Sequence, residues 1–189
     1  SQHMLVLANR EDAAAMNLFT LDLASGAMTA LGQAGNYHRS TAMAESGLKI
    51  ASVAGQWSQR PELNYFDTQN KDNNKVLTAS HDPAWNAVHL MQPERFHFLN
   101  RHGDQIDAYA FKPNNWSSSD HRPAIVYTYG GPLGDRHIIE TDSFQSTAYV
   151  FGMYMAAKHG YVTVAVDPRG HSNYGRKFSD ANWEQVGKP

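Results

Sequence analysis

The stretch Pro123-Ala124-Ile125-Val126-Tyr127-Thr128-Tyr129-Gly130-Gly131-Pro132 decides the architecture of the C-terminal half of this chain. Its first part, residues 124–129, is a short run of apolar, β-branched and aromatic residues, which is typical of a buried strand. The Gly-Gly-Pro that follows cannot continue a strand and predicts a sharp turn. Functional groups of open α/β sheets gather at the carboxyl ends of strands. The phenol of Tyr129 is therefore a candidate functional group, and a simple packing aromatic is the alternative.

A helix and a second strand are predicted after this turn. The helix would follow a loop over residues 133–141, start at a cap on Asp142 or Ser143 and end at Lys158-His159-Gly160. Residues 161–166 form a continuous apolar run, as in a strand buried on both faces. Strand, helix and strand in this order predict a βαβ unit. The spacing of 4, 3 and 4 residues places on one helix face Phe144, Ala148, Phe151 and Met155.

Upstream of this unit, residues 95–99 and 105–111 alternate apolar with polar side chains and flank His102-Gly103-Asp104. Two such runs around a short turn predict a β-hairpin. The C-terminal part of the chain, residues 81–189, is therefore expected to begin a mostly parallel α/β sheet with an antiparallel hairpin in front of it.

An internal repeat organises the N-terminal part. Residues 5–8 precede the similar residues 50–53 by 45 positions, and residues 18–22 precede residues 63–67 by the same 45 positions. Leu31 stands 45 positions before Val76. Short strands that recur at a period of about 40–50 residues are the sequence signature of β-propeller blades.

The second repeat looks complete, with strands expected at residues 38–44, 48–54, 63–68 and 75–79. The first repeat lacks an opening strand. A propeller typically closes with four to eight blades, so two blades over residues 1–80 would be part of a larger ring. Some other small sheet made of two hairpin pairs is the alternative.

Composition excludes several classes of protein. The formal net charge of −2 gives no electrostatic reason to expect nucleic acid or an anionic membrane as a partner. No apolar run reaches the length of a transmembrane helix, and no signal peptide is visible. The absence of cysteine excludes disulfides and thiolate metal sites but leaves the compartment open, periplasmic or cytoplasmic if the source is bacterial.

Several stretches resemble known functional motifs but lack a residue that the motif requires. The stretch Gly170-His171-Ser172-Asn173-Tyr174-Gly175 is not a Gly-x-Ser-x-Gly nucleophile elbow, because Tyr174 stands where the motif needs its second glycine. It is not a phosphate loop either, because Arg176-Lys177 replaces the required Lys-Ser/Thr pair. The histidines show no metal-binding spacing, so His137, His159 and His171 are interpreted as loop or helix-end residues rather than ligands. Arg60, in a loop that precedes the third strand of the second repeat, receives no role.

Three pieces of the chain carry a family resemblance: residues 129–132, residues 164–170 and residues 175–178. Together they resemble the prolyl oligopeptidase family of serine peptidases, and within it the dipeptidyl peptidase IV-like branch. In that family a β-propeller precedes an α/β-hydrolase domain. The resemblance therefore implies a partial all-β propeller over residues 1–80, followed by the N-terminal part of an α/β-hydrolase domain over residues 81–189.

The resemblance also implies a role for Tyr129, because the family's tyrosine in this turn donates its hydroxyl to the oxyanion hole. A phenol at a strand end can stabilise the negative oxygen that develops on the scissile carbonyl. Asp167 and Arg169 match the family's turn motif and are interpreted as a buried, loop-stabilising ion pair. Two positions depart from that motif: Pro168 stands where a small or polar residue is usual, and His171 stands where Ser or another small residue is common.

The resemblance implies a peptidase that acts on short peptides, with dipeptide release after Pro or Ala, and no metal or cofactor. The serine, aspartate and histidine of the triad are expected outside these 189 residues, so the chain alone is expected to be inactive. Expected partners are the peptide substrate and the rest of the polypeptide, or a self-association partner. A non-catalytic scaffold and an esterase or acylaminoacyl-peptide hydrolase on the same fold remain as alternatives.

Overall fold

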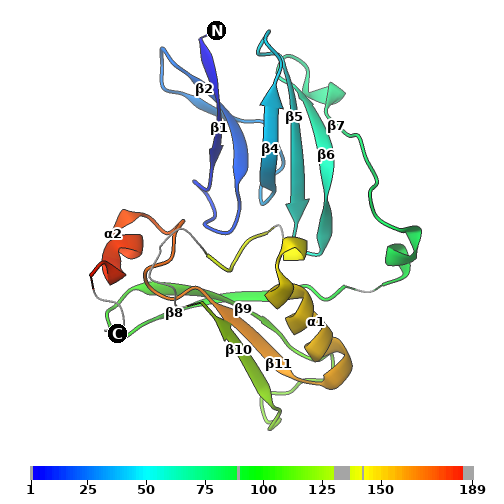
Figure 1. Cartoon of the computed structure of the whole chain (residues 1–189), viewed down its shortest axis with the longest axis vertical. Helices are drawn as coiled ribbons and strands as arrows, with labels where there is room; N and C mark the ends of the chain where they lie inside the picture. The colour runs from blue at the N-terminus through cyan, green and yellow to red at the C-terminus, as the bar shows by residue number, and fades with distance from the viewer. Residues whose placement is uncertain (1, 89, 130–136, 142, 185–189) are drawn as a thin grey trace. The chain divides into compact units, whose positions relative to one another are not determined.

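The computed structural model describes residues 2–88, 90–129, 137–141 and 143–184 (Figure 1). The chain divides into two compact units, Ser1–Val88 with Glu140–Asp142, and His89–Ile139 with Ser143–Pro189. β-strands dominate the regular structure of the first unit, whereas the second unit combines a β-sheet with helices. Within the described ranges, every helix is too short or too polar to cross a bilayer.

The first unit contains two antiparallel sheets. One has the strand order β1 (His3–Ala8), β2 (Asn17–Asp22) and β3 (Met28–Ala30). The second has the order β4 (Tyr37–Met43), β5 (Lys49–Gln56), β6 (Gln59–Asp67) and β7 (Lys75–Val76). Each strand pairs with its neighbour in the sequence (Figure 1).

The 45-residue offset is confirmed at the level of strands. β1, β2 and β3 are the counterparts of β5, β6 and β7, and the first sheet lacks a counterpart of β4 within the described residues. The buried residues Leu18, Leu31, Ile50 and Phe66 form one apolar cluster, with Leu5 packed against it. Since Leu5 and Ile50 are equivalent positions of the repeat, the repeated pattern places equivalent side chains in a shared core.

The prediction of a loop around Arg60 is wrong, because β6 already begins at Gln59. Ser58, in the left-handed conformation with φ 57°, closes a tight hairpin from β5 into β6. The register shifts between Ala54 and Gln56, opposite Pro61. Proline is tolerated in a strand at such an irregularity. The guanidinium of Arg60 lies 4.6 Å from the ring centroid of Trp85, so the side chain packs on an aromatic face.

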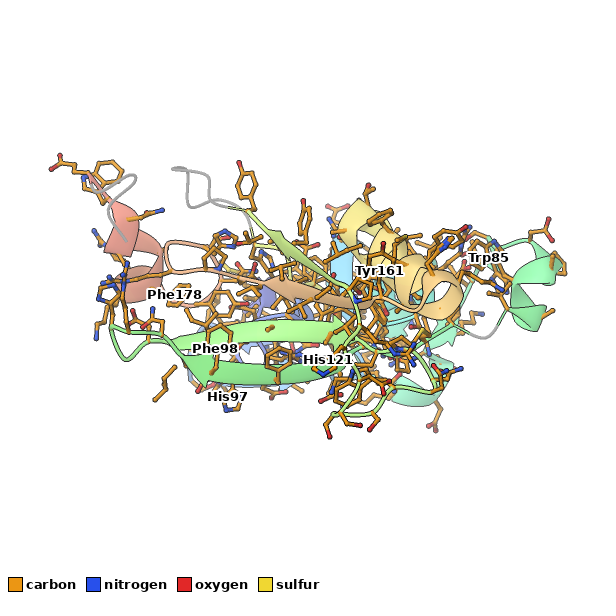
Figure 2. All side chains as sticks on the ribbon, turned by 90° about the horizontal axis from the view of Figure 1, so that it is seen from below. Trp85, His97, Phe98, His121, Tyr161 and Phe178 are labelled. Atoms are coloured by element: carbon orange, nitrogen blue, oxygen red, sulfur yellow. The ribbon has the colours of Figure 1, made fainter. Side chains whose placement is uncertain are left out.

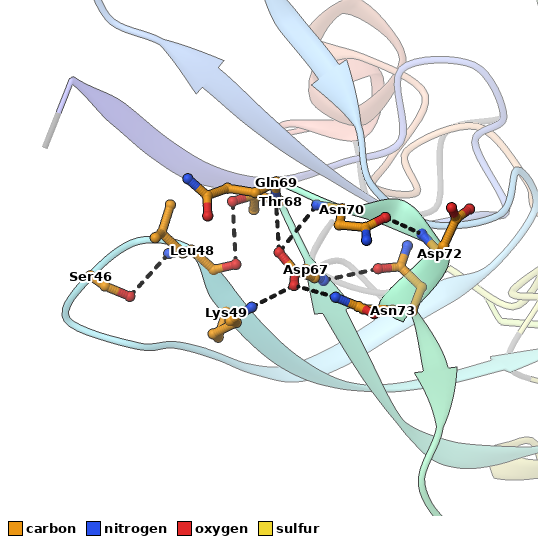
Figure 3. Close-up of polar contacts among 10 residues, drawn as sticks. Ser46, Leu48, Lys49, Asp67, Thr68, Gln69, Asn70, Asp72 and Asn73 are labelled. Carbon is orange, nitrogen blue, oxygen red and sulfur yellow. Dashed lines mark hydrogen bonds and ion pairs between the residues drawn. The ribbon is translucent and has the colours of Figure 1, made fainter.

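Asp67 fixes the turn between β6 and β7 (Figure 3). Its carboxylate accepts hydrogen bonds from the Lys49 ammonium, from Asn73 Nδ2 at 3.0 Å, and from the backbone amides of Gln69 at 3.0 Å and Asn70 at 3.3 Å. The Lys49 ammonium, together with these donors, holds the pKa of Asp67 well below its usual range. The chain between β6 and β7 is thus held by side-chain to backbone bonds.

His38 of β4 is buried at 1% exposure, and its Nδ1 lies 3.0 Å from the hydroxyl of Ser52, which is also buried. A Cβ added to Gly32 would lie 2.7 Å from Nε2, so the ring fills the space that a side chain at Gly32 would need. Burial lowers the pKa of His38 to about 4. The ring is therefore neutral at pH 7, and because Ser52 is sealed from solvent this Ser–His pair is structural.

The buried neutral His38 predicts acid destabilisation of the first unit. The folded-state pKa of about 4 lies below the ordinary 6.5, so the unfolded chain binds the extra proton first. Stability should be complete above pH 6.5 and decrease toward pH 4, by about 3 kcal/mol in all. Hydrogen-exchange protection factors of β4 and β5 between pH 7 and pH 4 measure this. The neutral variant His38→Gln should lose this part of the pH dependence; an unchanged profile would contradict the prediction.

The second unit contains a four-stranded sheet in the order β10 (Ala124–Thr128), β11 (Val162–Val166), β9 (Gln105–Phe111), β8 (Glu94–Leu99). β10 and β11 are parallel and joined through α1 (Thr147–His159), whereas β9 is antiparallel to both β11 and β8. The predicted hairpin and strand–helix–strand order are confirmed. Over the described residues of both units, the short helical elements are Lys71–Asn73, Pro83–Ala87, Ser143–Gln145, α2 (Arg176–Ser179) and Asp180–Asn182.

α1 differs from its prediction at the start and on its buried face. Ser146 caps the helix by accepting from the Tyr149 amide, so Ser143 is not the cap, and the alternative cap Asp142 lies outside the described residues. The buried face contains Tyr149, Gly152 and Ala156, whereas Phe151 is 51% exposed. Apolar residues surround most of this helix, so periodicity could not select the face. The predicted end is confirmed, with Gly160 at φ 73°.

The close approach of α1 to the sheet selects that face. A Cβ at Gly152 would lie 2.9 Å from Thr163 Oγ1, which donates a hydrogen bond to the Gly152 carbonyl at 3.1 Å. Beside it the Tyr149 ring packs edge-on against Phe111 and Tyr109, at centroid distances of 4.9 and 5.7 Å. Only a residue without a side chain fits at Gly152, and this brings the buried strand β11 against the helix.

β10 was predicted as a buried strand, and this is wrong for the described structure. Four of its five residues are exposed, with Val126 at 64% and Tyr127 at 46%. β10 lies at the end of the sheet, and its only strand partner among the described residues is β11. An apolar run shows that burial is favourable but cannot specify what covers the strand.

Candidate active site

The two parallel strands end at the same level. Thr128, the last residue of β10, is the register partner of Val166, the last residue of β11. Tyr129 and Asp167 therefore leave neighbouring strands at the same edge of the sheet. This is the edge where functional groups of α/β sheets gather. The turn predicted at residues 130–132 and most of the following loop lie outside the described residues.

Asp167 is the centre of this edge and is fully buried, at 0% exposure. Its carboxylate accepts from the backbone amides of Ile138 at 2.6 Å and Ile139 at 3.1 Å. It also accepts from the Tyr174 hydroxyl at 2.7 Å, and His171 Nδ1 lies 2.8 Å away. Burial by itself would raise the pKa of this carboxyl. The four donors outweigh burial, and the pKa of Asp167 lies below its usual range.

His171 joins the two strand ends. Its Nδ1 faces Asp167, and its Nε2 lies 2.5 Å from the backbone carbonyl oxygen of Tyr129. Only 3% of the ring is exposed. Burial alone would lower the pKa of His171, but the Asp167 carboxylate and the Tyr129 carbonyl outweigh burial and raise it. Sequence reasoning interpreted His171 as an ordinary loop residue; its departure from the family motif was the available signal.

Tyr129 itself remains accessible. Its side chain is 38% exposed, and its ring centroid lies 6.0 Å from that of His171, at an angle of 55°. The backbone of Tyr129 is thus anchored through its carbonyl, while more than a third of the residue remains exposed. A hydroxyl that extends from an anchored strand end is suited to donate a hydrogen bond to a developing negative charge.

Tyr174 completes the polar cluster from the loop after β11. Burial first, and then the negative charge of Asp167, raise the pKa of Tyr174 far above its usual value, so its hydroxyl keeps the proton that it donates. Its ring packs against Phe178 of α2, labelled in Figure 2, at a centroid distance of 5.0 Å. Sequence reasoning treated Tyr174 only as the residue that breaks an elbow motif and missed this role.

The predicted ion pair between Asp167 and Arg169 is absent from the described structure, and this correction has a simple cause. Arg169 points to Asp104 in the β8–β9 turn, with Nε 3.1 Å from the carboxylate. Both of these side chains are partly exposed. The buried Asp167 takes His171 as its cationic partner instead. The loop-stabilising role expected for Asp167 holds, through different partners.

The remaining sequence candidates do not join this cluster. His159 is the last residue of α1, as predicted, and stacks edge-on against Tyr154. His137 lies within hydrogen-bond reach of Asn173 Nδ2, at 2.9 Å. Over the described ranges, no three His, Asp or Glu side chains are arranged to hold a metal ion. A pocket of about 340 Å³ lies beside Arg169 and Pro168, but neither Tyr129 nor Asp167 lines it.

Comparison with known proteins gives a consistent picture. Residues 146–189 match the model of the prolyl oligopeptidase family. A dipeptidyl-peptidase 5 of Schizosaccharomyces pombe is 34% identical over 88 residues, which is 47% of this chain and 12% of that protein. A dipeptidyl-peptidase 5 of Aspergillus fumigatus is 28% identical over 113 residues, 58% of this chain and 15% of that protein. The chain thus spans only a small part of these curated relatives.

Among solved structures, an acylaminoacyl peptidase in complex with Z-Gly-Gly-Phe-chloromethyl ketone superposes with a TM-score of 0.68 at 19% identity. The match covers 97% of this chain and 26% of the other. At this identity the likeness concerns the fold alone.

Proposed function

We propose that the protein containing this chain is a serine peptidase of the prolyl oligopeptidase family, which hydrolyses short peptides through an acyl-enzyme; the match of residues 146–189 to the model of that family supports this. In this proposal Ser1–Val88 contributes blades of a β-propeller, and the β8–β11 sheet begins an α/β-hydrolase domain. The repeat of short antiparallel strands and the parallel β10–α1–β11 unit support this assignment.

The observation that carries the proposal is the position of Tyr129. It follows β10 directly, its carbonyl is held by His171, and its phenol is accessible. In acyl transfer the scissile carbonyl oxygen becomes negative, and a donor that is already oriented stabilises this charge without reorganisation. We assign the Tyr129 hydroxyl to this role. The end of β10 is held by His171, which bonds the Tyr129 carbonyl and contacts Asp167, and Asp167 in turn accepts from Tyr174.

The nucleophile must come from outside these 189 residues, because the sequence contains no Gly-x-Ser-x-Gly. The exposed edge of β10 offers a place where a further parallel strand could pair, and such a strand would end beside Tyr129. Acyl transfer also needs a base next to the serine. The chain by itself is therefore proposed to be inactive.

Two substrate classes are distinguishable within this proposal. The two matched fungal relatives are named dipeptidyl-peptidase 5, which favours release of a dipeptide with a free amino end. The family resemblance adds the expectation of cleavage after Pro or Ala. The alternative is a blocked aminoacyl group, the class for which the acylaminoacyl peptidase with the similar fold is named; that likeness concerns the fold and does not itself favour this class. We propose dipeptide release first, since the sequence relatives share more identity with this chain.

The test uses the full-length protein and a fluorophosphonate, which reacts covalently with an activated serine. We expect stoichiometric labelling, and turnover of a chromogenic Ala-Pro or Lys-Ala dipeptide substrate in preference to an N-acetylated alanine substrate. The 189-residue chain should remain unlabelled. Preference for the acetylated substrate would move the assignment to the second class. Absence of both labelling and turnover in the full-length protein would overturn the peptidase proposal and leave a binding or scaffold protein.

A further inference from the structure

One buried side chain connects the two strand ends of the site. His171 is four residues beyond Asp167, but its ring also reaches back to Tyr129, 42 residues earlier in the sequence. The imidazole bridges the Asp167 carboxylate at 2.8 Å and the Tyr129 carbonyl at 2.5 Å. His171 is only 3% exposed, so its ring is surrounded by protein atoms rather than by water.

The two contacts determine the protonation of the ring. A backbone carbonyl is only an acceptor, and an ionised carboxylate is also only an acceptor. Asp167 is kept ionised by two backbone amides and the Tyr174 hydroxyl, which all donate to it. Both nitrogens of His171 must therefore carry hydrogen if both bonds exist. This describes an imidazolium that donates in two directions.

We propose that His171 is a positioning residue of the active site: its imidazolium ties the backbone carbonyl of Tyr129 to the buried Asp167 carboxylate and so fixes the direction of the Tyr129 phenol. The proposal rests on the function proposed above for that phenol. It concerns a residue that touches neither the substrate nor the reacting atoms.

The physical effect follows from the geometry of the strand end. Tyr129 is the first residue after β10, so the β-ladder no longer holds its carbonyl. Without the ring bond, the Cα–Cβ direction of Tyr129 could rotate, and a displacement of about 1 Å at a reacting group can reduce the rate about 100-fold. A charge-assisted bond from an imidazolium is also stronger than a neutral one.

We call the bridge that the His171 ring makes between the Tyr129 carbonyl and the Asp167 carboxylate the clamp. Its formation should depend on pH, because it requires a protonated ring. Among the described residues, the titratable groups shown against the ring are Asp167 after β11 and Tyr129 after β10, and Tyr174 in the following loop donates to the same Asp167 carboxylate. The pKa of His171 is raised in the folded state, so the clamp is present below the ordinary 6.5 and is lost as pH rises through the folded value.

The protonation can be measured without an activity assay. In the full-length protein labelled with ¹⁵N-histidine, the ring nitrogens of His171, assigned through His171→Gln, should both carry protons at pH 7. Deprotonation should occur at a pH above 6.5. A ring that is neutral at pH 7 would overturn the proposal, because one of the two bonds could then not form.

The coupling to Tyr129 is tested by a double-mutant cycle in the same protein. His171→Gln should reduce kcat about tenfold or more and change KM little. In a Tyr129→Phe background the same replacement should reduce kcat less than about twofold, because the group that it positions is gone. Equal losses in both backgrounds would mean a general structural role and would overturn the proposal. The exposed His97 of β8, labelled in Figure 2, provides the control His97→Gln with unchanged kcat.

The two proposals fail in different ways. If Tyr129→Phe alone retains wild-type kcat, the function assigned to the phenol is wrong, and positioning by His171 falls with it. If Tyr129→Phe is defective but the His171 ring is neutral or the losses are additive, the function stands and only the positioning proposal is overturned. Should His171→Gln fold poorly, the ring signals can be assigned through bonds from the backbone resonances of the unaltered protein, and the NMR measurement then still decides.

Discussion

Replacement of Tyr129 by Phe is expected to lower kcat of the full-length protein about 10²- to 10³-fold at a nearly unchanged KM, as for the loss of one oxyanion-hole donor. The change removes one oxygen atom from a side chain that is 38% exposed, so the sheet should stay intact. The loss should fall on kcat because the hydroxyl bonds more strongly to the developing negative oxygen than to the neutral carbonyl. Steady-state kinetics with a chromogenic dipeptide substrate measures both constants.

A matched control lies two residues earlier. Tyr127 lies on β10, which Tyr129 follows directly; it is 46% exposed and undergoes the same chemical change in Tyr127→Phe. We expect that variant to keep kcat within about twofold of wild type, since it removes a hydroxyl outside the proposed site. Equal kinetics for the Tyr129→Phe and wild-type proteins, or equal losses at both positions, would refute the assignment of the oxyanion donor to Tyr129.

Asp167→Asn should destabilise the second unit by about 3–5 kcal/mol, the range for removal of one partner of a buried ion pair. Asparagine has one acceptor oxygen, and its amide group would face donors that now point at a carboxylate. The His171 imidazolium would also lose its buried counter-charge. Chemical denaturation of the variant, followed by hydrogen exchange in β10 and β11, measures the change in unfolding free energy.

The same substitution at Asp104 provides the comparison. Asp104 pairs with Arg169 in a partly exposed ion pair, and Asp104→Asn should change stability by less than about 1 kcal/mol. Adding His171→Gln to Asp167→Asn should restore part of the loss, because the unpaired buried cation is then removed. An Asp167→Asn protein as stable as Asp104→Asn would show that the Asp167 cluster does not hold the strand ends.

The stability that the Asp167–His171 pair gives the second unit should decrease at both acidic and alkaline pH. Asp167, with a lowered pKa, contributes stability that is present above its ordinary 3.8 and is lost as pH falls through the folded value. His171, with a raised pKa, contributes stability that is lost at the alkaline side. The second unit should therefore be most stable between these two limits.

The sequence by itself determined the local order of the chain. The 45-residue offset predicted the strands of both sheets in the first unit, since equivalent positions such as Leu5 and Ile50 carry equivalent side chains. The run before Gly130 and the run after Gly160 predicted β10 and β11, and the tyrosine at the end of β10 marked the candidate site. Such features depend on neighbours in the chain, which periodicity and turn residues encode.

Only the tertiary structure decided which partners those residues meet. The buried face of α1 depends on Gly152 lying against Thr163, which belongs to the next strand. Asp167 takes His171 and Tyr174 as partners, and Arg169 turns to Asp104 instead. His171 reaches Tyr129 across 42 residues because two parallel strands end at the same level. A local pattern contains no information about such distant contacts, so their geometry emerges only when the sheet is assembled.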